Sequence, residues 1–330
     1  MAVIWPRHSN TEILLNPKKG VQHYLDLVRT NWIYQGRKPY IAAMSAISFI
    51  KMHGLGNDFV IIDLRQQKLA LDPALVRRIT DRHRGVGGDM LITMKTPRNA
   101  RAQIFMGIYN ADGGEVDACG NATRCIARLM MEGTGKKQTV IETNAGLLQC
   151  WAADGGLITV DMGAPKFEWQ DIPLEERMDT RGVDIKIGPI DDPVLAFPGV
   201  VNVGNPHCVF FVPDVNAHDP ERIGPLVENH LLFPERTNVG FAQIRAHNDI
   251  RLRVWERGVG VTQACGTAAC AVVAVAARKG KNLADRKVRV ELDGGVLEID
   301  WREADDHIYM TGPAALSYRG MLAPELLAAP

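Results

Sequence analysis

Short apolar runs separated by turn residues dominate the chain from residue 47 onward. The runs are rich in Val, Ile, Leu and Phe and are too short for helices, which predicts strands. In the first half of the chain they cover residues 47–51, 59–63, 90–95, 103–109, 139–143, 147–151 and 157–162. The sequence Asp154-Gly155-Gly156 is a turn signal between two of them. The first half is therefore predicted to be mainly β-sheet.

Four segments carry helical signals instead. Asp72 followed by a proline is typical of a helix start and predicts a helix over 73–83. The segment 268–279 carries Ala, Val and Cys almost all round, which predicts a helix buried on every side and enclosed by sheet. Its counterpart at 122–132 is mixed in polarity, and a fourth helix is expected at 219–229.

The second half of the chain repeats the order of the first. Its strands are expected at residues 200–203, 208–212, 238–245, 249–255, 288–292, 296–301 and 307–311. A period of about 150 residues is too long for a solenoid repeat and fits a duplicated domain of ordinary size. The predicted fold class is α+β, with two similar and mostly antiparallel halves.

The repeat includes one motif whose side chains are suited to catalysis. Residues 118–121 read Ala-Cys-Gly-Asn and residues 264–267 read Ala-Cys-Gly-Thr, each opening into helix-forming sequence. Asn110 and Glu256 lie at the same distance before Cys119 and Cys265. One cysteine in each half suggests one thiol on each side of a shared cleft.

Composition narrows the class of protein. The chain has 330 residues, 46% hydrophobic content and a formal net charge of zero, which is typical of an ordinary globular protein. The sequence contains no stripe of basic residues of the kind that binds nucleic acid. No apolar run approaches the ~20 residues of a membrane span. Six cysteines do not make a disulfide scaffold at this size, so we expect a reducing, cytoplasmic compartment. Residues 1–46 stand outside the repeat, and we expect a poorly ordered N-terminal extension.

Two opposed thiols suit inversion of an amino-acid α-carbon without a cofactor. The α-proton is very weakly acidic, so a base must remove it while an acid on the opposite face supplies another. A thiol pKa of about 8.5 lies near working pH, and a helix N-terminus lowers it. The free backbone N–H groups that open each helix would hold the substrate carboxylate. These groups belong to Gly120, Asn121, Gly266 and Thr267.

Other interpretations of the cysteines remain open. A cysteine is most often a small buried apolar side chain, which suits Cys125, Cys150, Cys208 and Cys270. Zinc is disfavoured because the spacings from Cys119 to Cys125 and from Cys265 to Cys270 are not the usual ligand pairs. A disulfide between Cys119 and Cys265 would block the proposed chemistry.

Seven motifs, with their order and spacing kept, resemble the signatures of diaminopimelate epimerases. Together they are specific, and the resemblance covers about residues 47 to 320. The motifs are His53-Gly54-Leu55-Gly56-Asn57-Asp58-Phe59, Asn110-Ala111-Asp112-Gly113, Cys119-Gly120-Asn121, Gly204-Asn205-Pro206-His207, Asn238-Val239-Gly240-Phe241, Glu256-Arg257-Gly258 and Ala264-Cys265-Gly266-Thr267.

The resemblance implies an isomerase that converts LL-2,6-diaminopimelate to the meso form, for lysine and peptidoglycan precursors, with neither cofactor nor metal. It implies a homodimer, without nucleic-acid or membrane partners. Each subunit would have two pseudo-symmetric domains, each a barrel-like sheet around a central helix. The last strand would return to the first domain, which would comprise 47–163 plus 311–330, while 164–310 would form the second.

Site residues follow from the matched motifs. Cys119 and Cys265 would serve as base and acid, exchanging roles with reaction direction. Asn57 and His207 would flank the reacting centre. The remaining polar set would grip the distal amino-acid end of the substrate: Asn110, Asn205, Asn238, Glu256 and Arg257. A carboxylate suits the distal ammonium and an arginine fork suits the distal carboxylate.

Simpler roles compete with these assignments. Glu256 and Arg257 would alternatively form a surface pair, the asparagines would fill turns, and His207 would be a satisfied strand-end histidine. The chain also departs from the family pattern. Val261 stands where the family usually has glutamate, Met90 where glutamine is common, and Ala122 and Ala268 where glycine is common.

Three rival functions are compatible with parts of the pattern. A proline-racemase-like enzyme shares the two thiols but has a smaller substrate without a distal ammonium and carboxylate. An isomerase of the phenazine-biosynthesis type lacks the cysteine pair. An inactive binding protein on the same scaffold is the rival outside enzymes.

Overall fold

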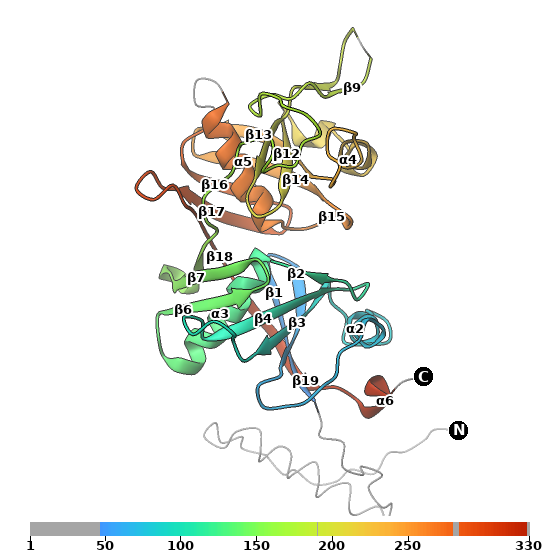
Figure 1. Ribbon diagram of the computed structural model, residues 1–330, viewed down its shortest axis with the longest axis vertical. Helices are drawn as coiled ribbons and strands as arrows, with labels where there is room; N and C mark the ends of the chain where they lie inside the picture. The colour runs from blue at the N-terminus through green and yellow to red at the C-terminus, as the bar shows by residue number, and fades with distance from the viewer. Residues whose placement is uncertain (1–46, 190, 280–283, 329–330) are drawn as a thin grey trace, which may run out of the picture. The chain divides into compact units, whose positions relative to one another are not determined.

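The computed structural model describes residues 47–189, 191–279 and 284–328. Figure 1 shows the arrangement of the helices and strands along the chain. The expected N-terminal extension, residues 1–46, lies outside the described residues. Among the described residues, no helix combines the length and the apolar composition that crossing a membrane requires.

The first half of the chain forms a mostly antiparallel sheet. Its first two strands pair antiparallel, the second pairs parallel with the third, and the third pairs antiparallel with the fourth. The fourth then pairs parallel with β6, and β6, β7 and β8 continue antiparallel. These strands are β1 (Ser48–Gly54), β2 (Asn57–Asp63), β3 (Met90–Lys95), β4 (Ile104–Asn110), β5 (Glu115–Val116), β6 (Gln138–Thr143), β7 (Gly146–Ala152) and β8 (Ile158–Asp161).

The second half repeats this pairing step by step, in the same parallel and antiparallel senses. Even the short β5, which pairs with β4, has a counterpart in β15, which pairs with β14. The strands are β11 (Gly199–Asn202), β12 (Pro206–Phe211), β13 (Asn238–Ala246), β14 (Asp249–Glu256), β15 (Gly260–Val261), β16 (Lys287–Leu292), β17 (Gly295–Trp301) and β18 (Ile308–Gly312). The internal repeat seen in the sequence is thus a repeat of topology.

Two pairings tie the halves together. β8 pairs antiparallel with β18, which makes the sheet continuous across the repeat. β19 (Ala315–Met321) then returns to pair antiparallel with β1, at the start of the first half. A separate two-stranded ribbon is made by β9 (Lys186–Ile187) and β10 (Leu195–Ala196).

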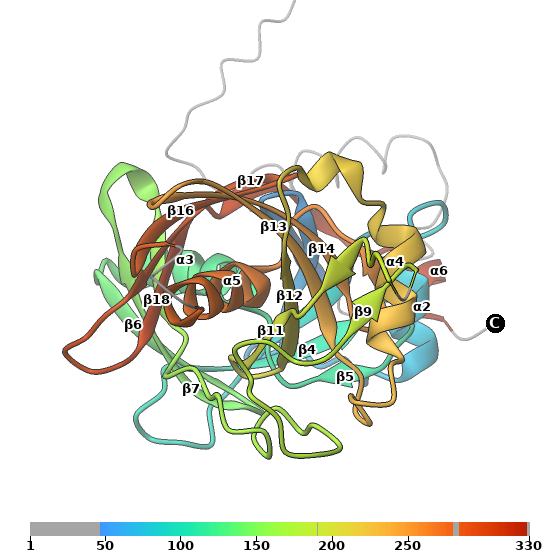
Figure 2. The ribbon, with the colours of Figure 1, turned by 90° about the horizontal axis from the view of Figure 1, so that it is seen from above.

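One long helix lies against the strands of each half. α3 (Gly120–Thr134) contacts β1, β6, β7 and β8, and α5 (Gly266–Arg278) contacts strands from β11 to β18. Figure 2 shows α5 with these strands around it. Ten of the thirteen residues of α5 are buried, as its apolar sequence predicts. The α+β fold class with two pseudo-symmetric halves is confirmed.

The remaining helices are short. They are α2 (Pro73–Thr80), α4 (Pro220–Glu228) and α6 (Pro324–Leu327), together with single 3-10 turns at Asp154–Gly156 and Val215–Ala217. α2 begins where its Asp72 cap predicts, because the Asp72 carboxylate accepts from the Leu75 N–H. α2 packs against β3 and α4 against β13 and β14, so the two helices hold equivalent places in the two halves.

Candidate active site

Cys119 and Cys265 line one cavity of about 490 Å³, to which both halves of the chain contribute. Each cysteine is the N-cap residue of a central helix, with extended backbone angles and no capping hydrogen bond from its side chain. The helices therefore begin two residues earlier than the sequence indicated, at the glycine after each cysteine. The unpaired N–H groups of both first turns lie beside the thiols. All six cysteines are free.

The two helix starts converge on a single side chain, Met310 of β18. A Cβ atom built on Gly120 would lie 2.8 Å from Met310 Cε, and one built on Gly266 would lie 2.9 Å from Met310 Sδ. Both distances are shorter than real Cβ contacts. The glycines thus allow two helix N-termini, each with a partial positive charge, to approach the same point.

A chain of amide groups surrounds the first thiol. Asn121 Nδ2 donates to the carbonyl oxygen of Ala264 at 2.9 Å and to Asn57 Oδ1 at 3.2 Å. Asn57 Oδ1 in turn lies 4.0 Å from Cys119 Sγ, within reach of a thiol donor. Arg124, whose side chain is fully buried, donates from Nη2 to Asn121 Oδ1 at 2.8 Å.

A carboxylate lies near the second thiol. Glu256, at the end of β14, accepts a short hydrogen bond from the Thr262 hydroxyl. Burial raises the pKa of Glu256, and hydrogen bonds from Thr262 and Cys265 oppose that rise. Cys265 Sγ also lies 3.4 Å from Thr267 Oγ1.

Burial decides the protonation of both thiols. It raises the pKa of Cys119 to about 11, helped by the charge of Glu256 and opposed by the N–H groups of Ala122 and Asn121. The pKa of Cys265 is raised well above its usual value by burial and by the charge of Glu256. Burial and the charge of Glu256 therefore favour two neutral thiols over a thiolate.

Most of the residues predicted from the sequence line this cavity. Besides the two cysteines, they are Asn57, Asn110, Gly120, Asn121, Asn205, Glu256, Gly266 and Thr267. Met90 and Val261, the two departures from the family pattern with the largest change in side-chain chemistry, line it as well. Ala122 and Ala268 are buried in the helices and are not among the lining residues.

Three predicted residues do not line the cavity in this structure. His207 is buried in β12, where its Nε2 lies 2.8 Å from Asn205 Oδ1. Asn238 is buried in β13, and its Oδ1 accepts from the Arg257 backbone N–H at 3.0 Å. The Arg257 side chain is exposed and donates to the Glu235 carbonyl oxygen at 2.9 Å. The first two side chains therefore contact residues that flank the cavity.

His207 is held neutral. Burial and the charge of Arg257 lower its pKa to about 3. Its Nδ1 is buried and has no hydrogen-bond partner within the described part of the chain. An unpaired nitrogen in an apolar setting is costly, and a protonated ring would cost more.

Sequence reasoning assigned no role to three charged residues that line the cavity: Arg82, Asp89 and Asp112. Asp112 lies in one of the matched motifs. For Arg82 and Asp89 the signal available was the Gly85-Val86-Gly87 segment that separates them, which matched the second half of the chain. Nothing in the linear sequence indicated that the carboxylate of Asp89 would contact Asn57, because that contact joins the start of β2 to the residue before β3.

Solved structures share this fold at low sequence identity. A probable proline racemase from Agrobacterium radiobacter superposes with a TM-score of 0.61 at 16% identity, covering 85% of this chain and 95% of its own. A phenazine biosynthesis protein of the PhzF family from Bacillus anthracis gives 0.57 at 17%, covering 85% and 100%. Fold and cavity together define this chain as a protein with the duplicated fold of these structures and with one thiol from each half in a shared cavity.

Sequence comparison narrows the class. A profile of the diaminopimelate epimerase family matches residues 49–168 and 199–317. Diaminopimelate epimerases from Nitrobacter hamburgensis and Afipia carboxidovorans are each 51% identical to the chain; they cover 85% and 86% of it, and 97% of their own length. The chain belongs to the diaminopimelate epimerase family, whose members are isomerases.

Proposed function

We propose that this protein interconverts LL-2,6-diaminopimelate and its meso form by moving one α-proton between Cys119 and Cys265. The observation that carries the proposal is the shared cavity, in which each thiol caps a buried helix of a different half of the chain. An enzyme that inverts a carbon needs a base and an acid that approach from different sides, and the repeat supplies them.

The proton inventory is balanced. One cysteine first releases its proton to water and becomes a thiolate. The thiolate then takes the α-proton, which leaves a carbanion conjugated with the α-carboxylate. The other cysteine, a thiol, gives its proton to the opposite face, so the two cysteines end with their protonation states exchanged. Because burial raises both thiol pKa values, either thiolate is a stronger base than an exposed cysteine would be.

Charge that develops on the α-carboxylate would meet the first-turn N–H groups of both helices. Gly120 and Asn121 open α3, and Gly266 and Thr267 open α5. Fixed donors of this kind stabilise a developing anion without reorganising, the same principle as an oxyanion hole. The same donors explain why no metal is needed in the proposed step.

The distal end of the substrate would lie against Glu256, Asn110 and Asn205. Glu256 is the anion for the distal ammonium. Arg257 is assigned to the distal carboxylate, which requires its exposed guanidinium to leave the Glu235 carbonyl and turn toward the cavity. We assign His207 and Asn238 to supporting roles, through Asn205 and the Arg257 backbone respectively.

The direct test uses deuterated water. Pure protein incubated with LL-diaminopimelate in D₂O should form the meso isomer with one deuterium at the inverted carbon, followed by mass spectrometry and chiral chromatography. A proline substrate in the same assay tests the proline-racemase-like alternative. Unchanged LL-diaminopimelate, with no label after long incubation, would refute the proposed activity.

We extend the proposal to assembly and location. β19 pairs only with β1 among the described strands and exposes the large side chains Leu316, Tyr318 and Met321, so it offers an edge for a second copy. The expected homodimer is tested by sedimentation of the wild type against Tyr318→Glu.

The return of β19 to β1 supports a first domain of 47–163 plus 311–330 and a second of 164–310. Six free cysteines favour a cytoplasmic location.

A further inference from the structure

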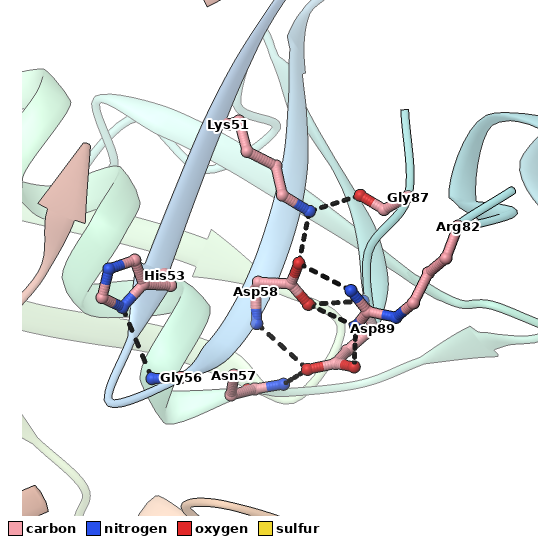
Figure 3. Close-up of polar contacts among 8 residues, drawn as sticks. All are labelled: Lys51, His53, Gly56, Asn57, Asp58, Arg82, Gly87 and Asp89. Atoms are coloured by element: carbon pink, nitrogen blue, oxygen red, sulfur yellow. Dashed lines mark hydrogen bonds and ion pairs between the residues drawn. The ribbon is translucent and has the colours of Figure 1, made fainter. Parts of the chain in front are cut away.

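The side-chain amide of Asn57 contacts a cluster of charged residues on one side (Figure 3) and the Cys119 thiol on the other. Its Oδ1 lies 4.0 Å from Cys119 Sγ and accepts from Asn121 Nδ2 at 3.2 Å. Its Nδ2 donates to Asp89 Oδ2 at 2.8 Å. The amide therefore presents its oxygen to the thiol and its NH₂ group to the carboxylate.

Asp89 makes this orientation the favoured one, because an ionised carboxylate only accepts hydrogen bonds. The Asp58 backbone N–H donates to the same Asp89 oxygen at 3.0 Å, and Arg82 Nη2 donates to the other oxygen at 2.7 Å. If the Asn57 amide turned over, its oxygen would face a carboxylate oxygen and its NH₂ would face the NH₂ of Asn121. Both contacts would be repulsive.

The charged cluster around Asp89 contains equal numbers of cations and anions. Arg82 also donates to both oxygens of Asp58, at 2.7 and 3.1 Å, and buried Lys51 pairs with the same carboxylate (Figure 3). Burial acts to raise the pKa of Asp58, but the hydrogen bonds from Arg82 and Lys51 outweigh it and lower the pKa to about 2. Two cations thus face two anions.

The opposite end of the amide chain is fixed in the same way. Arg124 can only donate, and it donates to Asn121 Oδ1, so Asn121 must direct its NH₂ toward Asn57. Two amides in series therefore lie between a group that only accepts and a group that only donates. Neither amide can turn without placing two donors or two acceptors against each other.

We infer that Asp89 is a positioning residue that acts through Asn57 to present an amide oxygen to the Cys119 thiol. The inference rests on the proposed role of Cys119. An oxygen that faces sulfur accepts from the thiol and disfavours the thiolate. Asp89 thereby helps to keep Cys119 protonated and in place, and it makes the thiolate a stronger base when it forms.

The test is Asp89→Asn, which keeps shape but offers an NH₂ group, so that the Asn57 amide can turn. We expect kcat to fall by about 10- to 100-fold with KM within about threefold, because a misplaced base affects the chemical step more than binding. Alkylation of Cys119 by iodoacetamide, read by peptide mass spectrometry, should shift to lower pH. Asp89→Glu keeps an acceptor and should recover part of the activity.

The control is Asp63→Asn, which removes a similar carboxylate at the other end of β2, paired with Arg65 and outside the cavity. It should behave as wild type. The deciding measurement is Asp89→Asn in an Asn57→Ala background, where the alkylation profile should no longer move. A shift that persists there, or no shift in the single variant, overturns the inference. Alkylation needs no substrate, so a wild type that fails to epimerise diaminopimelate would refute the proposed function separately.

Discussion

Asn121 donates a 2.9 Å hydrogen bond from its side-chain amide to the carbonyl oxygen of Ala264, 143 residues further along the chain. Asn121 lies in the first turn of α3, and Ala264 immediately precedes Cys265. The bond therefore links the helix start of one thiol to the backbone of the other. It adds a direct link between the two thiol-bearing segments through one buried amide, which is 3% exposed.

Removing either the proposed acid or the proposed base should lower turnover by orders of magnitude. Cys119→Ala and Cys265→Ala are each expected to lower kcat by about 10²- to 10⁴-fold, the usual contribution of a positioned acid or base. The measurement is formation of the meso isomer in D₂O, with circular dichroism to check folding. Cys150→Ala is the control, because Cys150 is a free cysteine that is buried in β7 and lies outside the cavity. Turnover in either cysteine variant close to that of the control would exclude the two-thiol mechanism.

A methyl group added at the start of α3 should reduce activity more than stability. Gly120→Ala would push on Met310, which also contacts Gly266, so the change reaches both thiols. Because the Met310 side chain is flexible, we expect an unfolding free energy loss of only about 1 kcal/mol but a larger fall in activity. Gly133→Ala in the same helix meets nothing within 4 Å and should instead stabilise by about 0.5–1 kcal/mol. Urea unfolding and steady-state rates measure both; equal activity in the two variants would contradict the shared contact.

The Thr262 hydroxyl should tune substrate affinity through Glu256. Thr262→Val removes a hydrogen bond that lowers the Glu256 pKa, so the carboxyl gains a proton at higher pH than in wild type. If Glu256 holds the distal ammonium, KM should then rise as pH falls, more at pH about 6 than at pH about 8. Thr262→Ser keeps the hydroxyl and should follow wild type. A KM that does not change with pH in the valine variant would remove Glu256 from ammonium binding.

His207 should make stability pH-dependent. Its pKa is about 3 in the folded protein and about 6.5 when unfolded. Below pH about 6.5 the His207 ring is protonated in the unfolded chain but stays neutral in the folded protein. The free energy of unfolding therefore falls as pH drops from about 6.5 toward about 3. By pH 5 the loss is about 2 kcal/mol, at about 1.4 kcal/mol per unit. Urea unfolding at pH 7.5 and 5 should show this loss in wild type and not in His207→Gln. An equal loss in both would assign it to other groups.

The sequence carried the features that depend on local pattern or on repetition. The two cysteine motifs, the all-apolar helix around Cys270 and the duplicated strand order all follow from spacing along the chain. The exact helix start did not, because glycine at the first helical position is a poor helix former and gave no signal. Contacts made across the sheet could not be predicted either, because they join residues that are far apart in the sequence. Whether His207 faces a cavity or a neighbouring asparagine is decided by the packing of β12, not by its neighbours in sequence.

The return of β19 to β1 has a consequence for folding during translation. β1 is the first of the described strands that the ribosome makes, whereas its partner β19 is the last of them. β8 likewise waits for β18. Throughout most of translation the N-terminal sheet therefore has two unfinished borders, which are the kind that recruit other strands. A nascent chain stalled before residue 308 should depend on chaperones far more than the finished one.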